Sequence, residues 1–111
     1  MLSNPKDFAA FAGDGITRSH PLFVARIRRT DLETTRFGFS TGRKLGGAVV
    51  RNRVRRRLRE VLRVMAPSFR PGWDVLIIAR PALVEVDHET LVGAMRRLLD
   101  RSGVLGGPAT T

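Results

Sequence analysis

The sequence contains no cysteine, which excludes disulfide bonds, cysteine-ligated metals and thiol catalysis. It also lacks a long apolar run: none is longer than that from Val75 to Ala79, which is far too short to span a bilayer. Residues 1–12 show no basic stretch followed by an apolar segment, the pattern of a secretion signal. We therefore expect a soluble, cytoplasmic protein with no membrane partner.

Groups of residues that could form a catalytic site are also scarce. His20 precedes a proline and His88 lies at an expected helix start, and neither has a partner in sequence that would orient it. The carboxylates are scattered, and none is spaced with a histidine as metal ligands are. The glycine-rich segment 42–47 lacks the Gly-Lys-Ser/Thr ending of a nucleotide-binding loop. We predict no catalytic residue and no metal ligand in the protein itself.

Positive charge is what the sequence has in excess. The net charge is +10 over 111 residues, and arginine supplies all but two of the 20 basic side chains. So much charge repels itself in a compact chain, which favours a polyanionic partner. Nucleic acid is the first candidate and an anionic membrane surface the second, while a basic protein without such a partner is the third possibility.

The residue pattern predicts seven secondary-structure elements. Strands are indicated by alternating apolar and polar residues, and helices by apolar residues at helical spacing between capping and breaking residues. In chain order these are a helix between Asn4 and Gly13, strands over 16–18, 22–29 and 36–41, a helix over 48–65, a strand over 74–79 and a helix over 88–101.

The order α-β-β-β-α-β-α predicts an α+β fold, a small two-layer sandwich of helices on a sheet. The polar segment from Thr30 to Thr35 suits a hairpin connection between the second and third strands. The strand over 74–79 is almost continuously apolar, which indicates burial on both faces. We expect one domain over 1–101 and a flexible C-terminal tail over 102–111.

The basic residues concentrate between Arg43 and Arg63, where nine of them accompany a single acid, Glu60. Positive charges one turn apart weaken an isolated helix by a few tenths of a kcal/mol per pair, a cost that bound phosphates would offset. The planar guanidinium group bridges two phosphate oxygens or stacks on an unpaired base. The core-facing stripe of this helix consists of Val50, Val54, Leu58, Val61, Leu62 and Met65.

Two other partners suit this helix less well than RNA does. A membrane is disfavoured because the apolar stripe has no Trp or Phe anchor and is needed to cover the sheet. Sequence-specific DNA binding is disfavoured because arginine coats the helix in place of mixed base-reading side chains. A second possible function is that of a noncatalytic ribosomal protein or general RNA-binding module, because the same basic helix would serve it.

Several local patterns follow one another in a distinctive order. They are Asp7-Phe8, RFGFS over 36–40, RKLG over 43–46, AVVRNRVRR over 48–56 and DVLIIAR over 74–80. Together they resemble the protein subunit of bacterial ribonuclease P over about residues 2–99. By this resemblance, Gly47 departs from the usual asparagine of the turn, and Ala12 and Arg26 stand where relatives often carry aromatic residues.

The resemblance implies a subunit of the ribonucleoprotein endonuclease that removes the 5′ leader from precursor tRNA. Its RNA subunit would carry the catalytic site with Mg²⁺ as the cofactor, and the partners would be ribonuclease P RNA and precursor tRNA, with no further protein required. The fold would be ribosomal protein S5 domain 2-like, with a left-handed βαβ crossover where the general rule favours a right-handed one.

The resemblance also implies two RNA-binding surfaces, a basic helix that faces the catalytic RNA and a cleft between the first helix and the sheet that holds the leader. Because strand side chains alternate, some of the cleft residues predicted on strands face the core instead. The predicted contacts to the catalytic RNA are Arg43, Lys44, Arg51, Asn52, Arg53, Arg55, Arg56 and Arg59. The predicted cleft residues are Phe8, Val24, Arg26, Phe37 and Phe39.

Overall fold

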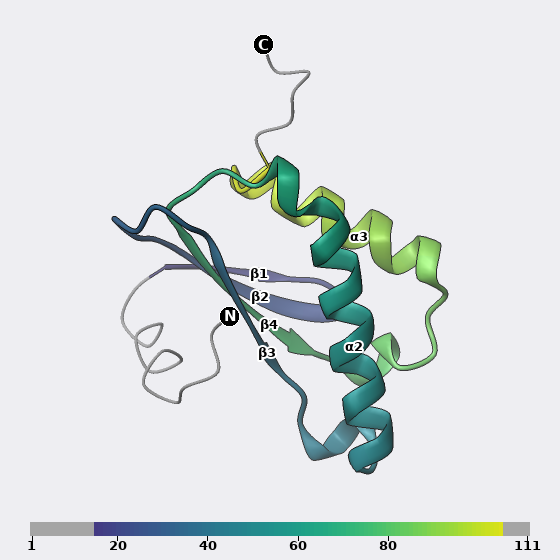
Figure 1. The fold of residues 1–111 in the computed structure, drawn as a ribbon. Helices are drawn as coiled ribbons and strands as arrows, with labels where there is room; N and C mark the ends of the chain where they lie inside the picture. Colours follow the sequence, from purple (N-terminus) through teal and green to yellow (C-terminus); the bar gives the residue numbers. More distant parts are fainter. Residues whose placement is uncertain (1–14, 106–111) are drawn as a thin grey trace.

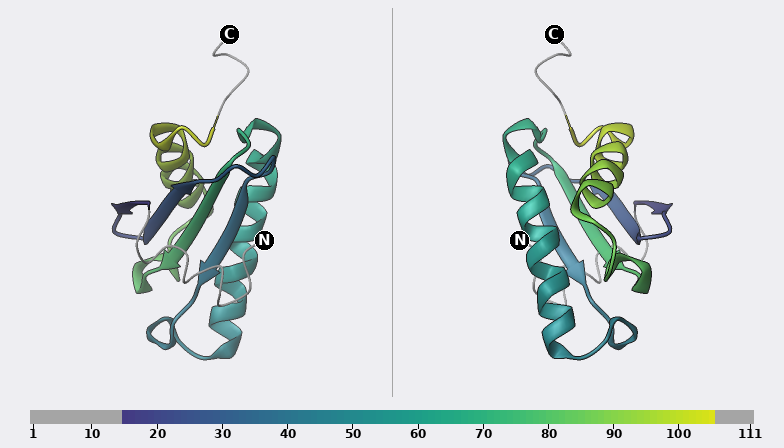
Figure 2. Two further views of the ribbon diagram at one scale, coloured as in Figure 1. Left: turned by 90° about the vertical axis from the view of Figure 1, so that its left-hand side faces the viewer. Right: turned by 90° about the vertical axis from the view of Figure 1, so that its right-hand side faces the viewer.

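A computed structural model describes residues 15–105, which form a four-stranded sheet with two helices on one face (Figures 1 and 2). The elements are β1 (Ile16–Ser19), β2 (Phe23–Arg29), β3 (Arg36–Ser40), α2 (Ala48–Met65), β4 (Trp73–Ala79) and α3 (His88–Ser102). The strand order is β1-β2-β4-β3, with β3 and β4 parallel and the other pairs antiparallel. The predicted α+β class is confirmed.

The strand register gives the sheet two unlike faces. On the face covered by α2 and α3, Phe23, Ala25 and Ile27 of β2 lie beside apolar residues of β4. The opposite face, called the back face below, carries the alternate residues. It comprises Thr17, Ser19, Val24, Arg26, Arg28, Arg36, Gly38, Ser40, Asp74, Leu76 and Ile78.

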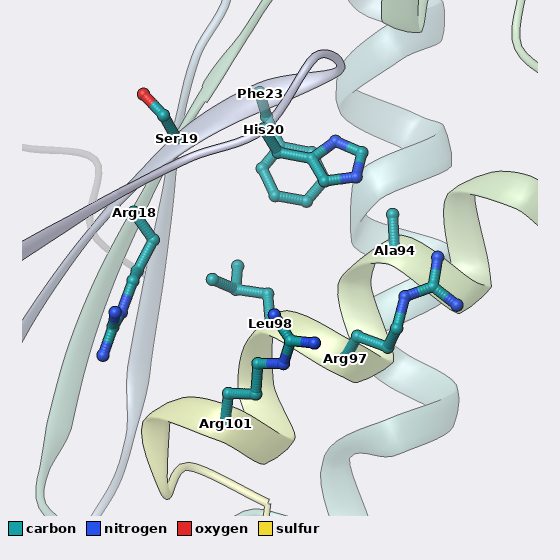
Figure 3. Close-up of a pocket in the computed structure, with 8 residues that line it drawn as sticks. All are labelled: Arg18, Ser19, His20, Phe23, Ala94, Arg97, Leu98 and Arg101. Carbon is teal, nitrogen blue, oxygen red and sulfur yellow. The ribbon is translucent and has the colours of Figure 1, made fainter.

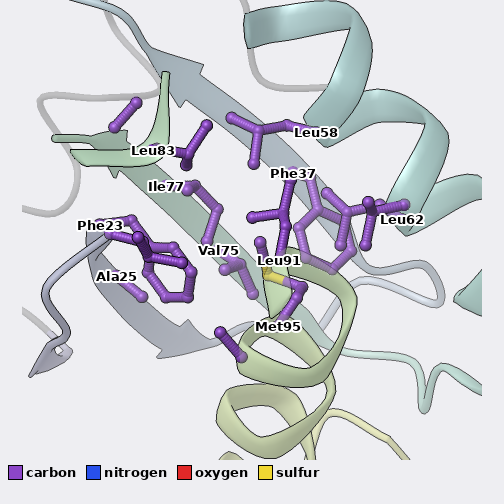
Figure 4. Packing of buried hydrophobic residues seen from close by; sticks show 14 of the residues in the cluster. Phe23, Ala25, Phe37, Leu58, Leu62, Val75, Ile77, Leu83, Leu91 and Met95 are labelled. Carbon is purple, nitrogen blue, oxygen red and sulfur yellow. The ribbon is translucent and has the colours of Figure 1, made fainter. Parts of the chain in front are cut away.

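The core lies between the sheet and the two helices (Figure 4). Leu58 and Leu62 of α2 pack near Phe37, and Leu91 and Met95 of α3 complete the layer. β4 is buried along most of its length because it is a central strand, as its apolar sequence predicts. This core fixes where the outward side chains of both helices point.

Helix α2 has the predicted bounds, and its predicted stripe is buried from Val54 to Met65. Val50 is half-buried against Gly46, which has a φ of 134°. A Cβ added at Gly46 would lie 3.2 Å from the Val50 side chain, so glycine allows the loop to approach the helix closely. Among residues 15–105, no helix is long and apolar enough to span a membrane.

The expected hairpin between β2 and β3 is wrong, because β4 lies between these two strands. The chain entering β4 is hydrogen-bonded to the loop that was expected to form the hairpin. Thr30 N donates to Gly72 O at 2.8 Å, and Gly72 N donates to Thr34 O at 3.3 Å. Consecutive strands are usually neighbours, and here a strand from later in the chain replaces that pairing.

The boundary of the predicted C-terminal tail also has to be corrected. Helix α3 continues to Ser102, and Gly103 ends it with a φ of 87°. Val104 is fully buried, and Leu105 forms a β-bridge with Phe69. Residues 102–105 therefore belong to the packed domain. The first predicted helix and the rest of the predicted tail lie outside the described residues.

Candidate RNA-binding surfaces

The exposed side of α2 is the more basic of the two predicted surfaces. Asn52, Arg53, Arg56 and Arg59 are exposed, whereas Arg51 and Arg55 flank the buried stripe and are half-buried. Asn52 is oriented by Arg55, whose Nη1 donates to its Oδ1 at 2.9 Å. The predicted set on this helix therefore forms one continuous surface, called the α2 surface below.

The charge of the α2 surface decreases toward the end of the helix. Arg63 donates to Glu60 at 2.6 Å, and both side chains are exposed. The hydrogen bond and charge of Arg63 hold the pKa of Glu60 below its usual range. At the other end of α2, Gly47 offers no side-chain cap and the first turn contains no acid. The uncompensated charge and the helix N-terminus together favour anions at this end.

Arg57 has a different role from its neighbours on α2. Its guanidinium group donates to the carbonyl oxygens of Leu83 at 3.1 Å, Val84 at 3.4 Å and Val86 at 2.5 Å. These carbonyls belong to the turn that connects β4 to α3. Arg57 thus joins α2 to that turn, a role that the count of basic residues in the sequence does not reveal.

The loop before α2 extends the basic surface toward the sheet. Arg43 and Lys44 are exposed in a short 3-10 turn (Arg43–Leu45), and buried Leu45 anchors it. The two basic residues line a cavity of about 490 Å³ with Ser40 and Arg80, at the ends of β3 and β4. Arg80, which was not predicted as a site residue, therefore lies beside the predicted loop.

The residues predicted to line the cleft do not all lie on the same face of the sheet. Val24 and Arg26 lie on this face, opposite Ile78 and Leu76 of β4. Phe37 is only 6% exposed in the core, and Phe39 packs against the core from the same side. Phe37 and Phe39 are therefore the predicted cleft residues that alternation on β3 turns toward the helices and the core. Phe8 lies outside the described residues.

One end of the back face holds a buried carboxylate between two arginines. Asp74 is 1% exposed, and Arg36 donates to it from Nε at 2.9 Å and from Nη2 at 2.8 Å. Arg28 donates to the same carboxylate at 3.3 Å. Burial disfavours the ionised form, but the hydrogen bonds and charges of Arg36 and then Arg28 outweigh it, so the pKa of Asp74 is lowered. The sequence offers only an acid at the start of an apolar strand.

The histidines occupy unlike places. His88 is exposed at the start of α3, whereas His20 lies in the turn after β1 and accepts a hydrogen bond from Leu22 N at its Nδ1. Within the part of the chain that the structure describes, no three His, Asp or Glu side chains gather as a possible metal site.

A two-layer α+β domain with an arginine-coated helix and a basic sheet face belongs to the class of RNA-binding proteins. Comparison with known proteins identifies the family within this class. A family model described as Ribonuclease P matches residues 1–103. The ribonuclease P protein component of Roseiflexus castenholzii is 40% identical over 107 residues, covering 96% of this chain and 88% of that protein. That of Herpetosiphon aurantiacus is 37% identical over 101 residues, covering 91% and 82%.

Solved structures agree with the sequence comparison. The RNase P protein from Thermotoga maritima is similar with a TM-score of 0.82 at 29% identity, covering 90% of this chain and 94% of that one. The protein from Staphylococcus aureus has the same fold, with a TM-score of 0.83 at 24% identity, covering 94% and 95%. The chain belongs to the ribonuclease P protein family. This is the protein subunit of the endoribonuclease holoenzyme that processes the 5′ end of precursor tRNA, and its partners are ribonuclease P RNA and the precursor.

Proposed function

We propose that the protein binds the catalytic RNA through the α2 surface and the preceding loop, and holds the 5′ leader against the back face. The observation that carries this division is that the basic groups lie on different sides of one rigid core. Arg53, Arg56 and Arg59 point away from the sheet, whereas Arg26 lies on the face opposite the helices. One RNA segment cannot cover both sets without passing around the edge of the domain.

The α2 surface suits folded RNA. Its exposed arginines form phosphate contacts without a neighbouring acid until Glu60, and Asn52 can both donate to and accept from RNA groups. Of the residues predicted to contact the catalytic RNA, Arg43 and Lys44 continue this surface through their exposed loop. The half-buried Arg51 and Arg55 are the members that also support the helix edge.

The back face suits a single strand. It presents Val24 and Arg26 of β2 and Ser40 of β3 as half-buried side chains, with the apolar Leu76 and Ile78 of β4 between the two strands. Where relatives often have an aromatic residue, Arg26 replaces base stacking, worth roughly 1–3 kcal/mol per base, by charge. In this proposal the RNA subunit, with Mg²⁺, supplies the catalytic site that cleaves the precursor tRNA. The protein side chains bind and orient the RNA.

Reconstitution at low magnesium concentration tests the function. The protein is mixed with bacterial ribonuclease P RNA and precursor tRNA, and leader removal is compared with that by the RNA alone. We expect faster cleavage with the protein present, because its cationic side chains replace part of the Mg²⁺ that otherwise screens the repulsion between RNA phosphates. A rate equal to that of the RNA alone would refute the proposed function.

Paired variants test the division into two surfaces. Arg53→Ala with Arg56→Ala should weaken binding to ribonuclease P RNA and reduce the salt dependence by about 0.7–0.9 log units per lost phosphate contact. Arg70→Ala with Arg96→Ala removes two exposed arginines elsewhere and serves as the matched control. Equal losses in both pairs would mean that only net charge matters.

We also propose that the crossover from β3 through α2 to β4 is left-handed, as in the ribosomal protein S5 domain 2-like fold. The parallel pairing of β3 with β4 requires a crossover, and family membership is what supports the left-handed sense. An experimental structure with a right-handed crossover would contradict it.

A further inference from the structure

A basic pocket lies between the edge strand β1 and helix α3, on the side of the domain away from β3 (Figure 3). It measures about 250 Å³. Its polar lining comes from Arg18 and Ser19 of β1, His20 of the following turn, and Arg97 and Arg101 of α3. None of these arginines belongs to either surface proposed above.

The charge of this pocket is not balanced by its own lining. Arg18, Arg97 and Arg101 are exposed, and no carboxylate lines the pocket among the described residues. Arg80 adds a fourth guanidinium nearby, because its Nη2 donates to Ser19 Oγ at 3.5 Å. Burial lowers the pKa of His20, and the charges of Arg97 and Arg80 lower it further. The positive potential of the pocket therefore comes from its arginines, and the lowered pKa favours the neutral form of His20.

His20 is held rigidly at the pocket wall. Its ring stacks on Phe23 with centroids 4.9 Å apart and planes 17° apart, and Phe23 is fully buried. Its Nδ1 accepts the Leu22 N–H at 3.0 Å, so the proton of the neutral ring resides on Nε2. The wall thus presents one N–H donor on a fixed ring beside three exposed guanidinium groups, which is the donor set of a phosphate site.

We propose that this pocket binds a backbone phosphate of RNA and forms a third RNA contact of the protein. The inference rests on the proposed RNA-binding function. A cavity of this size is smaller than the pockets of drug-sized ligands, so it suits one phosphate and its ribose. The sheet order places the pocket at the opposite edge from β3, so it holds a segment that has passed beyond the other two surfaces. The phosphate comes from the catalytic RNA or from the precursor tRNA, and the experiments distinguish these sources.

The first experiment compares Arg97→Gln with Arg101→Gln against Arg70→Gln with Arg96→Gln. Both pairs remove two exposed arginines, and Arg96 lines a groove on the other side of α3. The affinity for ribonuclease P RNA, and that of the holoenzyme for precursor tRNA, are measured over a range of salt concentrations. We expect the pocket pair to flatten one of these salt dependences by about 0.7–0.9 log units per lost contact and the control pair to leave it unchanged.

The second experiment maps the RNA directly. Because the chain has no cysteine, Arg101→Cys provides a single attachment site for a hydroxyl-radical probe, with Arg96→Cys as the control. Strand scission in ribonuclease P RNA assigns the pocket to the catalytic subunit, and scission in the precursor assigns it to the substrate. Scission no stronger than with the control, or equal salt dependences for both glutamine pairs, overturns the third contact. If the unaltered protein binds neither RNA, the proposed function itself fails.

Discussion

At the scale of single residues, Asp74 shows how this sheet accommodates a buried ionised carboxylate. Its carboxylate is buried at the start of β4, yet two arginines of the neighbouring strands bind it from the back face. The arginines are 23% and 31% exposed, so they remain partly hydrated while the acid does not. Such a group stabilises the fold only while it is ionised and paired.

Replacing the carboxylate should therefore destabilise the protein in a pH-dependent way. Asp74→Asn should lower the free energy of unfolding by about 2 kcal/mol at pH 7, because it removes a buried anion that accepts charged hydrogen bonds from Arg36 and Arg28. The folded-state pKa lies below the ordinary value of 3.8, so this contribution is fully present above 3.8 and is lost as pH falls through the folded-state value.

Urea unfolding measured at pH 7 and again below pH 3.8 checks this prediction. The difference between the protein and Asp74→Asn should narrow as the pH is lowered. Asp31→Asn, at an exposed loop position, is the control and should change stability little. A difference that stays constant across this pH range would show that the charge of Asp74 is not what stabilises the fold.

At the scale of elements, α2 combines three functions on one helix. One side completes the core, the exposed side presents arginines, and Arg57 between them fastens the helix to the turn before α3. Adjacent residues of the same type thus have unlike roles. Arg57 follows Val54 by three positions and precedes Val61 by four, which places it next to the buried stripe.

The neighbours Arg56 and Arg57 separate binding from stability. Arg57→Ala should lower the free energy of unfolding by about 1–3 kcal/mol, because carbonyl groups of the turn lose their donor. Arg56→Ala should leave stability nearly unchanged and weaken binding to ribonuclease P RNA. Thermal unfolding and RNA titration of both variants check this, and a stable Arg57→Ala would show that solvent satisfies the turn equally well.

Elements that depend on local periodicity could be predicted from the sequence, and pairings between distant segments could not. The bounds of α2 follow from its apolar stripe and from Pro67 just beyond it. The strand order does not follow, because nothing in the loop from Thr30 to Thr35 indicates that β4 enters between β2 and β3. Alternation defines the two faces of β3, but only the packed helices show that Phe37 belongs to the core.

The candidate sites also differ in whether local sequence predicts them or whether they depend on contacts between distant segments. The α2 surface was predictable because its arginines are contiguous in sequence and the helix spreads them over one side. The pocket beside His20 was not, because Arg18 and Arg97 are far apart in the chain and meet only when α3 packs beside β1. Long-range packing is therefore what single-sequence reasoning misses here.

At the scale of the whole molecule, the net charge of +10 is distributed over separate sides of a small rigid domain. The core between sheet and helices keeps the α2 surface and the back face at a fixed relative orientation. Under the division of surfaces that we propose, the protein aligns two RNAs with each other by binding both. Binding at one surface then need not change the other.

This independence predicts additive effects of variants on the two surfaces. With ribonuclease P RNA at saturating concentration, Arg26→Ala should weaken holoenzyme binding to precursor tRNA but not to the mature tRNA that lacks a leader. Arg53→Ala with Arg56→Ala should act on assembly with the catalytic RNA, and the combined variant should show the sum of both free-energy changes to within about 0.5 kcal/mol. Titrations with leader-bearing and leaderless RNA measure each term. A larger coupling would mean that the leader and the catalytic RNA share one surface, because side chains on opposite sides of a rigid core have no other direct means of interacting.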